Sequence, residues 1–197
     1  CRQLDPSRMT TLASIGALEP ESPLNHITDI LSYNHYFGWY YGDVEETGSW
    51  YDTFHQRFPN RCIGISEYGC DANIAWHTSA PALGDYSEEY QACYHEKMLE
   101  QIMARPYLWA THVWNMFDFG ADNRDCGQNT KGLVTFDRKI KKDSFYLYKA
   151  HWSTEKFVHI CSRRYIDRAE AVTRVKIYSN AGRIRLFVND RPLADQN

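Results

Sequence analysis

The sequence lacks any run of about 18 consecutive apolar residues, the length that a membrane-spanning helix needs. Its N-terminus also lacks the basic, apolar and small-residue zones of a signal peptide. Charge of one sign is not in excess, because 22 basic and 25 acidic residues are spread along 197 positions and give a net charge of −3. Neither a nucleic-acid partner nor a membrane partner is therefore expected. The location stays open, with the cytoplasm favoured over secretion for a bacterial source.

Patterns typical of metal sites are also missing. The six cysteines form no CxxC pair, and no histidine lies at zinc-ligand spacing from them, so reduced structural thiols are expected. The acidic residues Asp118, Asp122 and Asp125 lack the spacing of a calcium loop. This segment and the basic run at 139–142, which ends in Lys142, are both expected to be solvated loops. No metal and no cofactor are predicted.

Aromatic residues are abundant. They make up 15% of the chain, with 6 Trp and 14 Tyr, and hydrophobic residues in total make up 43%. This is enough apolar material for one medium-sized domain or two small ones. Aromatic rings fill protein cores, and their flat faces also stack on sugar rings.

Short apolar runs alternate with helical patterns over residues 1–153. Runs rich in apolar and β-branched residues predict strands at 8–14, 27–34, 62–66 and 107–114. A helix is predicted before Pro59, because Trp50, Phe54 and Phe58 recur at helical spacing. Strands that alternate with helices favour parallel βαβ units.

A second, longer helix is predicted between Asp85 and Pro106. Asp85 and Glu88 form a plausible capping box at its start, and Pro106 stops it.

An all-β module is predicted to begin at residue 154. Strand-like runs occupy 157–161, 172–179 and 183–189, and the last two are expected to form a hairpin across 180–182. Both ends of the chain are expected to be cut, because a βα barrel needs eight units and a sandwich needs more strands.

Polar and aromatic side chains gather where three of the predicted strands end, which is the edge of a βα barrel that carries function. These groups contain Tyr36, Glu67 and Trp114. Glu67 directly follows an apolar strand, where a carboxylate is costly to bury without a partner; a surface glutamate is the alternative. A tyrosine of the preceding loop is suited to donate a hydrogen bond to it and hold it ionised for attack.

Four motifs in order carry a resemblance to a known family. The segments are YNHYFGWYYG, ISEYG, HVWNMFDFG and NTKGLVTFDRKIKKD, and they resemble the second half of the glycoside hydrolase family 2 barrel, found in β-galactosidases and β-glucuronidases. The later segments VKIYSN and LFVND are similar to the β-domain that follows it. The resemblance implies an α/β fold: the C-terminal half of a TIM (β/α)8 barrel over 1–153, followed by the beginning of an all-β immunoglobulin-like sandwich domain over 154–197.

The resemblance also assigns roles to residues. It implies that Glu67 is the catalytic nucleophile and that Tyr36 orients it. Trp114 is expected to form a platform for the sugar, and the Asn-x-Lys-Gly segment to reach the far side of the sugar. The expected substrate-binding residues are Asn34, His35, Tyr40, Trp114, Asn129 and Lys131.

Two departures from the family pattern matter. Family members carry an acid/base glutamate in an Asn-Glu pair, and these 197 residues contain no such pair. The chain alone is therefore expected to be inactive, because general acid catalysis contributes about 10² to 10⁴-fold. Cys70 stands where some galactosidases of the family have a histidine, which favours the glucuronidase-like branch over those particular galactosidases.

The first functional expectation is a retaining β-galactosidase that acts on terminal β-galactosides. The alternative is a β-glucuronidase or other β-uronidase, because the Lys131 ammonium is suited to pair with a uronate carboxylate. The structural alternative for Lys131 is that it faces solvent or pairs with Asp137. A non-catalytic carbohydrate-binding or structural role stays open for the chain alone, and a homo-oligomer stays open for the full-length enzyme.

Overall fold

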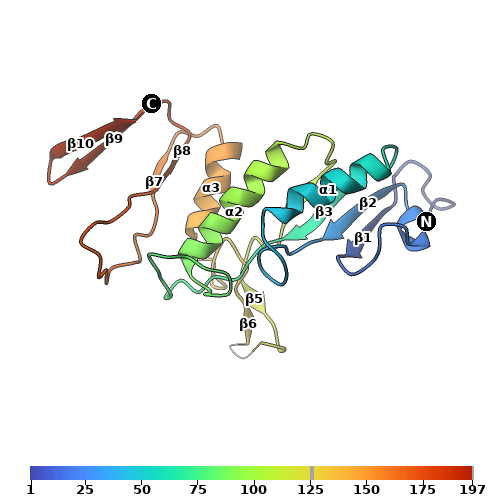
Figure 1. Ribbon diagram of the computed structural model, residues 1–197, viewed down its shortest axis with the longest axis horizontal. Coiled ribbons are helices and arrows are strands. Elements are labelled where there is room, and N and C mark those ends of the chain that lie inside the picture. The colour runs from blue at the N-terminus through green and yellow to red at the C-terminus, as the bar shows by residue number, and fades with distance from the viewer. Residues whose placement is uncertain (125–126, 197) are drawn as a thin grey trace.

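The computed structural model describes residues 1–124 and 127–196, so Asp125, Cys126 and Asn197 lie outside the described residues. The N-terminal part is built on one parallel sheet with strand order β1-β2-β3-β4 (Figure 1). Its strands are β1 (Thr11–Ile15), β2 (Ile30–Asn34), β3 (Ile63–Tyr68) and β4 (Thr111–Val113). The four strands predicted for this part are confirmed, each shorter than predicted or shifted by a few residues.

The register of the sheet places the candidate site. β2 pairs in parallel with β1 and with β3, and Asn34 at the end of β2 lies opposite Glu67 near the end of β3. Because all four strands are parallel, their carboxyl ends lie at one edge of the sheet, where the predicted site residues follow them.

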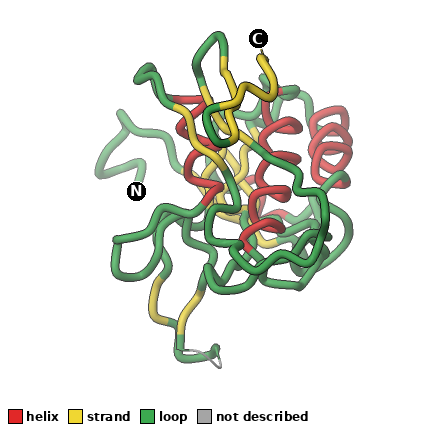
Figure 2. Tube along the Cα trace, turned by 90° about the vertical axis from the view of Figure 1, so that its left-hand side faces the viewer, coloured by secondary structure: helices red, strands yellow, loops and turns green. Residues whose placement is uncertain are grey.

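Three helices accompany the sheet: α1 (Glu46–Arg57), α2 (Glu88–Met103) and α3 (Asp143–Trp152). The crossovers from β2 to β3 and from β3 to β4 place α1 and α2 beside each other on one face of the sheet, as connections of one hand require (Figures 1 and 2). Their apolar faces bury Tyr51, Phe54 and Met98 against strand residues such as Leu31 and Ile65. The helix predicted before Pro59 is confirmed, since α1 ends at Arg57.

The connection between β1 and β2 contains no α-helix. It holds only the single 3-10 turn η1 (Pro23–His26). Pro20 and Pro23 fall within this connection, and proline cannot donate the backbone hydrogen bonds that a helix interior requires.

The start of α2 differs from the predicted capping box. Ser87, not Asp85, is the N-cap, and its hydroxyl accepts a hydrogen bond from the Tyr90 backbone N–H at 3.0 Å. Asp85 instead accepts from the Ser87 N–H at 2.7 Å and shapes the turn that leads into the helix. Glu88 is fully buried and accepts from the Asp143 N–H, so it joins α2 to α3.

The C-terminal part is a set of short antiparallel strands. β7 (Val158–Ile160) pairs with β8 (Ile177–Ser179), and β9 (Ile184–Val188) pairs with β10 (Arg191–Gln196). The predicted hairpin across 180–182 is therefore wrong. The two-residue loop is Asn189-Asp190, where both residues have positive φ (48° and 63°), the combination that a tight type I′ hairpin turn needs.

Strands β7 and β8 pack on the helices. His159 Nε2 lies 2.8 Å from Asp143 Oδ1 at the start of α3, and the Tyr178 hydroxyl donates to Glu96 of α2 at 2.5 Å. The division into 1–153 and 154–197, and the immunoglobulin-like identity of the second part, stay predictions.

Two chain-wide findings concern the described residues. None of their helices is both long and apolar enough to span a membrane. The five cysteines among them are free thiols, two of them buried (Cys70 and Cys161).

Candidate active site

Glu67 is held by a tyrosine from the neighbouring strand. The Tyr36 hydroxyl donates a hydrogen bond to Glu67 Oε2 at 2.6 Å. Tyr36 follows β2 and Glu67 lies in β3, so the sheet register itself brings them together. Burial, and then the bond to Glu67, raise the pKa of Tyr36 well above its usual range, so the phenol stays protonated and keeps donating.

Trp114 is locked against the exit of β3. Its backbone N–H donates to the Tyr68 carbonyl at 2.8 Å, and its ring packs edge-on against Phe119. The Trp114–Asn115 peptide bond is cis. Gly69 lies so close to the Trp114 carbonyl that a Cβ at this position would be 2.0 Å from its oxygen, so a residue without a side chain is required here.

Lys131 is buried at the same edge of the sheet. Its side chain is 1% exposed, and its ammonium donates to Asp71 Oδ2 at 2.5 Å and to the Tyr40 hydroxyl at 2.7 Å. The alternative of a solvent-facing Lys131, or one paired with Asp137, is wrong. Asp137 lies 3.5 Å from Lys139 instead.

An aromatic group surrounds the Lys131 ammonium. Its nitrogen lies 4.8, 5.7 and 5.8 Å from the ring centroids of Tyr40, Trp39 and Tyr36. Ring faces attract cations, so these contacts stabilise the charged ammonium in a buried place.

Arg124 extends this cluster toward solvent. Its guanidinium donates to the Tyr40 hydroxyl at 2.9 Å and lies 3.8 Å from Asp71 Oδ2. The Tyr40 hydroxyl thus accepts from both Lys131 and Arg124, which leaves its own hydrogen to be donated elsewhere. Two cations and one carboxylate give the cluster a surplus of one positive charge.

A second buried ion pair holds the loop that carries Lys131. Lys142 is fully buried, and its ammonium donates to Asp118 Oδ1 at 2.9 Å and to the Ala72 and Thr130 carbonyls. Asp118 Oδ1 also accepts from the Gly132 N–H at 2.8 Å. The expectation of solvated loops is therefore wrong for Asp118 and for Lys142. Burial raises the pKa of Asp118, and the Lys142 charge opposes that rise.

The two asparagines of the predicted site are used partly within the protein. Asn129 is buried, and its side-chain oxygen accepts from the Lys131 N–H at 3.1 Å, which shapes the loop after the short strand β6 (Gln128–Asn129). β6 pairs with β5 (Phe119–Gly120) in a hairpin that projects from the body of the molecule (Figures 1 and 2). Asn34 accepts from the Ser66 hydroxyl at 2.7 Å, beside Glu67.

His35 is not brought to this group. Its ring is 2% exposed and lies among Tyr33, Trp50 and Tyr51, on the side of β2 that faces α1. Neither ring nitrogen has a hydrogen-bond partner among the described residues. Burial lowers the pKa of His35 to about 3, so the imidazole is neutral.

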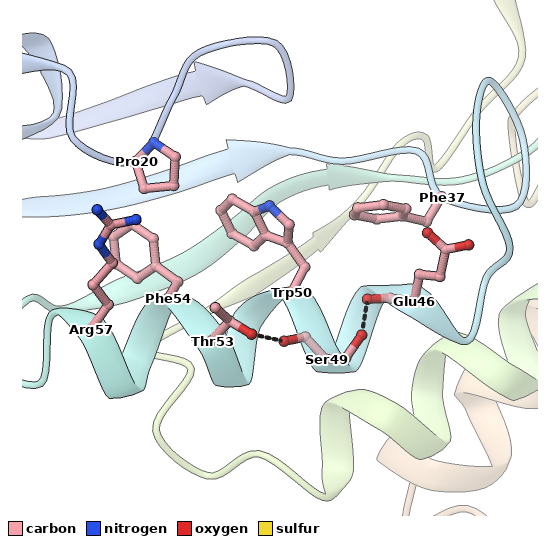
Figure 3. Close-up of a pocket in the computed structure, with 8 residues that line it drawn as sticks. All are labelled: Pro20, Phe37, Glu46, Ser49, Trp50, Thr53, Phe54 and Arg57. Carbon is pink, nitrogen blue, oxygen red and sulfur yellow. Dashed lines mark hydrogen bonds between the residues drawn. The ribbon is translucent and has the colours of Figure 1, made fainter.

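A cavity of about 260 Å³ lies between α1 and the connection from β1 to β2, and Glu67 is not among its lining residues. Trp50 and Phe54 point from the helix toward the loop that holds Pro20, and Arg57 closes one end (Figure 3).

Sequence reasoning missed Asp71 and Arg124. Asp71 follows Glu67 by four positions, so a second carboxylate at the exit of the same strand was a readable signal. Arg124 lies in a polar loop, and nothing local distinguishes it from a solvated arginine.

The parallel sheet, with a tyrosine-held carboxylate at its carboxyl edge, has the arrangement of part of a βα barrel. The chain belongs to the glycosyl hydrolases family 2, because residues 1–157 match the model of the TIM barrel domain of that family.

The relatives match 95% or more of this chain. A β-glucuronidase of Bacteroides fragilis is 38% identical over 95% of this chain. The crystal structure of an FMN-binding β-glucuronidase from Facaelibacterium prausnitzii L2-6 is 50% identical over 100% of the chain with a TM-score of 0.97. The crystal structure of a putative β-galactosidase from Bacteroides fragilis is 36% identical over 98% of the chain with a TM-score of 0.88.

The chain is much shorter than these relatives. It spans 28% of the B. fragilis β-glucuronidase, 31% of the F. prausnitzii chain and 30% of the putative β-galactosidase. It corresponds to less than a third of a family enzyme.

Proposed function

We propose that the full-length protein is a retaining β-glucuronidase in which Glu67 is the nucleophile. One observation carries this proposal. Tyr36, which donates to Glu67, and Tyr40, which accepts from Lys131, come from one segment, and their ring centroids are 5.0 Å apart. A carboxylate suited to attack and an ammonium suited to bind a carboxylate therefore lie on either side of one tyrosine pair.

The proposed reaction is a double displacement. Tyr36 fixes Glu67 Oε2, and the other carboxylate oxygen attacks the anomeric carbon while the bond to the aglycone oxygen breaks. An acid/base carboxyl about 5 to 5.5 Å away protonates the leaving oxygen and then takes a proton from the water that releases the sugar. No residue of this chain is assigned to that second role. Trp114 is proposed to pack against the apolar face of the sugar.

The Lys131 cluster is proposed to bind the C6 carboxylate of a glucuronide. Lys131 has a third N–H, Arg124 has further N–H donors, and Tyr40 has a free hydroxyl hydrogen. The Asn129 amide nitrogen is a fourth candidate donor, since the Asn129 oxygen serves the loop. A desolvated charge-assisted hydrogen bond contributes roughly 1.5 to 3 kcal/mol, and a neutral hydroxymethyl group gains much less.

A β-galactoside is less well supported as the substrate. Two of the three relatives above are named β-glucuronidases, including the one at 50% identity, while one is described as a putative β-galactosidase. The buried, paired Lys131 adds to this, because the structural alternative that accompanied the galactoside expectation was a lysine that faces solvent or pairs with Asp137.

The test is hydrolysis of p-nitrophenyl glycosides by the full-length protein. We expect kcat/KM for the β-glucuronide to exceed that for the β-galactoside by at least about a hundredfold, on the order of two charge-assisted contacts. A preference for the galactoside would overturn the proposal and restore the first expectation.

FMN binding is a property of the F. prausnitzii enzyme and is not proposed for this chain. The described part of this chain has a cavity of about 670 Å³ between α2 and the segment that leads to β8. Three cationic and three acidic side chains share its wall: Arg168, Arg174 and Lys176, with Glu89, Asp143 and Glu170. This balance does not favour a phosphate dianion, and the Tyr165 ring is already covered by Arg168 and stacked on His77. The proposed hydrolysis uses no flavin.

A further inference from the structure

Asp71 connects the strand of the proposed nucleophile to the loop of the proposed carboxylate-binding lysine. It lies four residues after Glu67 and is 1% exposed. Oδ1 accepts from the backbone N–H and the hydroxyl of Thr130, at 2.9 and 3.1 Å, and Oδ2 accepts from Lys131 at 2.5 Å. The backbone N–H of Ala72 also donates to the Thr130 carbonyl at 3.0 Å, so the two segments are fastened side by side.

We propose that Asp71 is a positioning residue for uronate recognition, which holds the Lys131 ammonium charged and at a fixed place relative to Glu67. The inference rests on the proposed β-glucuronidase function. Asp71 does not touch the sugar in this role. It acts through Lys131 and through the loop that carries Asn129.

The charge balance supports a role beyond anchoring the loop. A lysine that is 1% exposed needs a counter-ion to remain charged, because burial alone disfavours the ammonium. Asp71 supplies that counter-ion, and Arg124 restores a surplus of one positive charge. The cluster thus presents the net charge that one carboxylate neutralises.

The neighbouring pair of Asp118 and Lys142 provides a matched comparison. It is also a buried Asp–Lys pair, and it fastens the same loop through Gly132 and Thr130. Lys142 donates all three of its hydrogen bonds to protein groups, so it has no donor left for a ligand. Loss of Asp118 therefore reports what a purely structural role does.

The expected signature is a change in substrate preference. The charged or polar groups that face the Lys131 ammonium are Asp71, Tyr36 and Tyr40, with Arg124 beyond Tyr40. Asp71 is the acidic partner of Lys131 among them. Without it, the ammonium loses the hydrogen bond to Oδ2 that fixes its place, so binding of a C6 carboxylate should weaken more than binding of a neutral sugar.

The experiment uses the full-length protein and two substrates that differ only at C6, p-nitrophenyl β-glucuronide and β-glucoside. The ratio of their kcat/KM values is measured at one pH for the wild type, Asp71→Asn, Asp71→Glu and Asp118→Asn. Ionisation of the acid/base group and the nucleophile affects both substrates and cancels in the ratio.

For Asp71→Asn the ratio should fall at least about tenfold below the wild type, the value of one charge-assisted hydrogen bond. Asp71→Glu, which keeps the charge, should restore most of the ratio even if both rates fall. Asp118→Asn should lower kcat/KM for both substrates together and leave the ratio unchanged.

Two results would overturn the inference. One is an Asp71→Asn ratio that equals or exceeds the wild-type ratio, which includes a uniform loss of kcat/KM on both substrates as for Asp118→Asn. The other is a ratio for Asp71→Glu that stays as low as the ratio for Asp71→Asn. Failure of the proposed function looks different, because the wild type itself would then not prefer the glucuronide.

Discussion

Gly69 and Trp114 are in backbone contact at the point where β3 ends. A Cβ at position 69 would lie 2.0 Å from the Trp114 carbonyl oxygen and 3.1 Å from the carbonyl carbon. The strand of the proposed nucleophile and the proposed sugar platform are therefore fixed to each other through main-chain atoms, which cannot move aside as a flexible side chain would.

Replacing Gly69 by alanine should shift either Glu67 or Trp114. We expect a loss of stability of about 1 to 3 kcal/mol, typical of overpacking, with a fall in kcat/KM of tenfold or more. Thermal unfolding and glucuronide kinetics of the full-length protein measure both. Gly182→Ala is the control, since a Cβ there meets nothing within 4 Å. Equal behaviour of the two variants would show that the contact is not tight.

The assignment of the nucleophile predicts the behaviour of Glu67→Gln. This change keeps the shape of the side chain and removes the attacking carboxylate. Turnover should fall by about 10³-fold or more, while binding of the substrate stays within a few-fold of the wild type. A 2-fluoro glucuronide should label the wild type at Glu67, as seen by peptide mapping. A label on another carboxylate would refute the assignment.

The hydrogen bond from Tyr36 predicts a more graded loss. Tyr36→Phe keeps the ring and its packing on Tyr40 but removes the donor to Glu67 Oε2. A hydrogen bond to a charged group contributes about 1.5 to 3 kcal/mol, so kcat/KM should fall by about 10 to 150-fold. KM for the glucuronide should change little, because the sugar-binding groups stay in place. A variant with wild-type kcat would show that Glu67 needs no such support.

The sequence predicted those features that depend on local patterns. The strands β1 to β4 and β7 to β9, the helices α1 and α2, and the order of the site motifs follow from runs and spacings within about 20 residues. The pairing of Tyr36 with Glu67 followed from the family resemblance, and the structure shows the hydrogen bond.

Features that depend on distant segments were missed or wrong. Lys131 and Asp71 are 60 positions apart, and Lys142 and Asp118 are 24 apart. A lysine that is buried through a distant partner has the same local sequence as a solvated one, so Lys142 was expected in solvent. The hairpin was placed at 180–182 for a related reason: Asn-Ala-Gly and Asn189-Asp190 both suit turns, and only strand pairing decides between them.

Lys131→Ala should lower kcat/KM more for a charged substrate than for a neutral one. Loss of the ammonium should lower kcat/KM for the β-glucuronide by about 10 to 150-fold, the value of one charge-assisted bond, with a much smaller effect on the β-glucoside. Lys139→Ala is the matched control, because that lysine is exposed and lies 3.5 Å from Asp137 at the surface. If Lys131→Ala lowers kcat/KM equally for both substrates, the lysine supports the loop and does not bind the carboxylate.

The buried imidazole of His35 makes the stability of the protein depend on pH. Burial lowers the pKa of His35 to about 3, while a histidine in the unfolded chain has a pKa near 6.5. Between these two values the unfolded chain binds the proton and the folded chain does not. The contribution of His35 to stability is therefore complete above about pH 6.5 and is lost progressively as the pH falls toward 3.

At pH 5 the stability lost through His35 is about 2 kcal/mol, since each unit of pKa difference corresponds to 1.36 kcal/mol. Burial also lowers the pKa of His95 to about 3. This residue adds a similar pH dependence, so a substitution of His35 should remove only part of the total.

His35→Phe suits the surrounding rings of Tyr33 and Trp50 and cannot titrate. We expect the thermal unfolding midpoint of this variant to fall less steeply than that of the wild type between pH 7.5 and 5. The variant should therefore gain stability relative to the wild type as the solution becomes acidic. His112→Gln, at an exposed position, is the control variant. If the curves of unfolding midpoint against pH are parallel for His35→Phe and the wild type, His35 also takes up a proton in the folded protein. The ring cluster around it would then open more easily than its burial indicates.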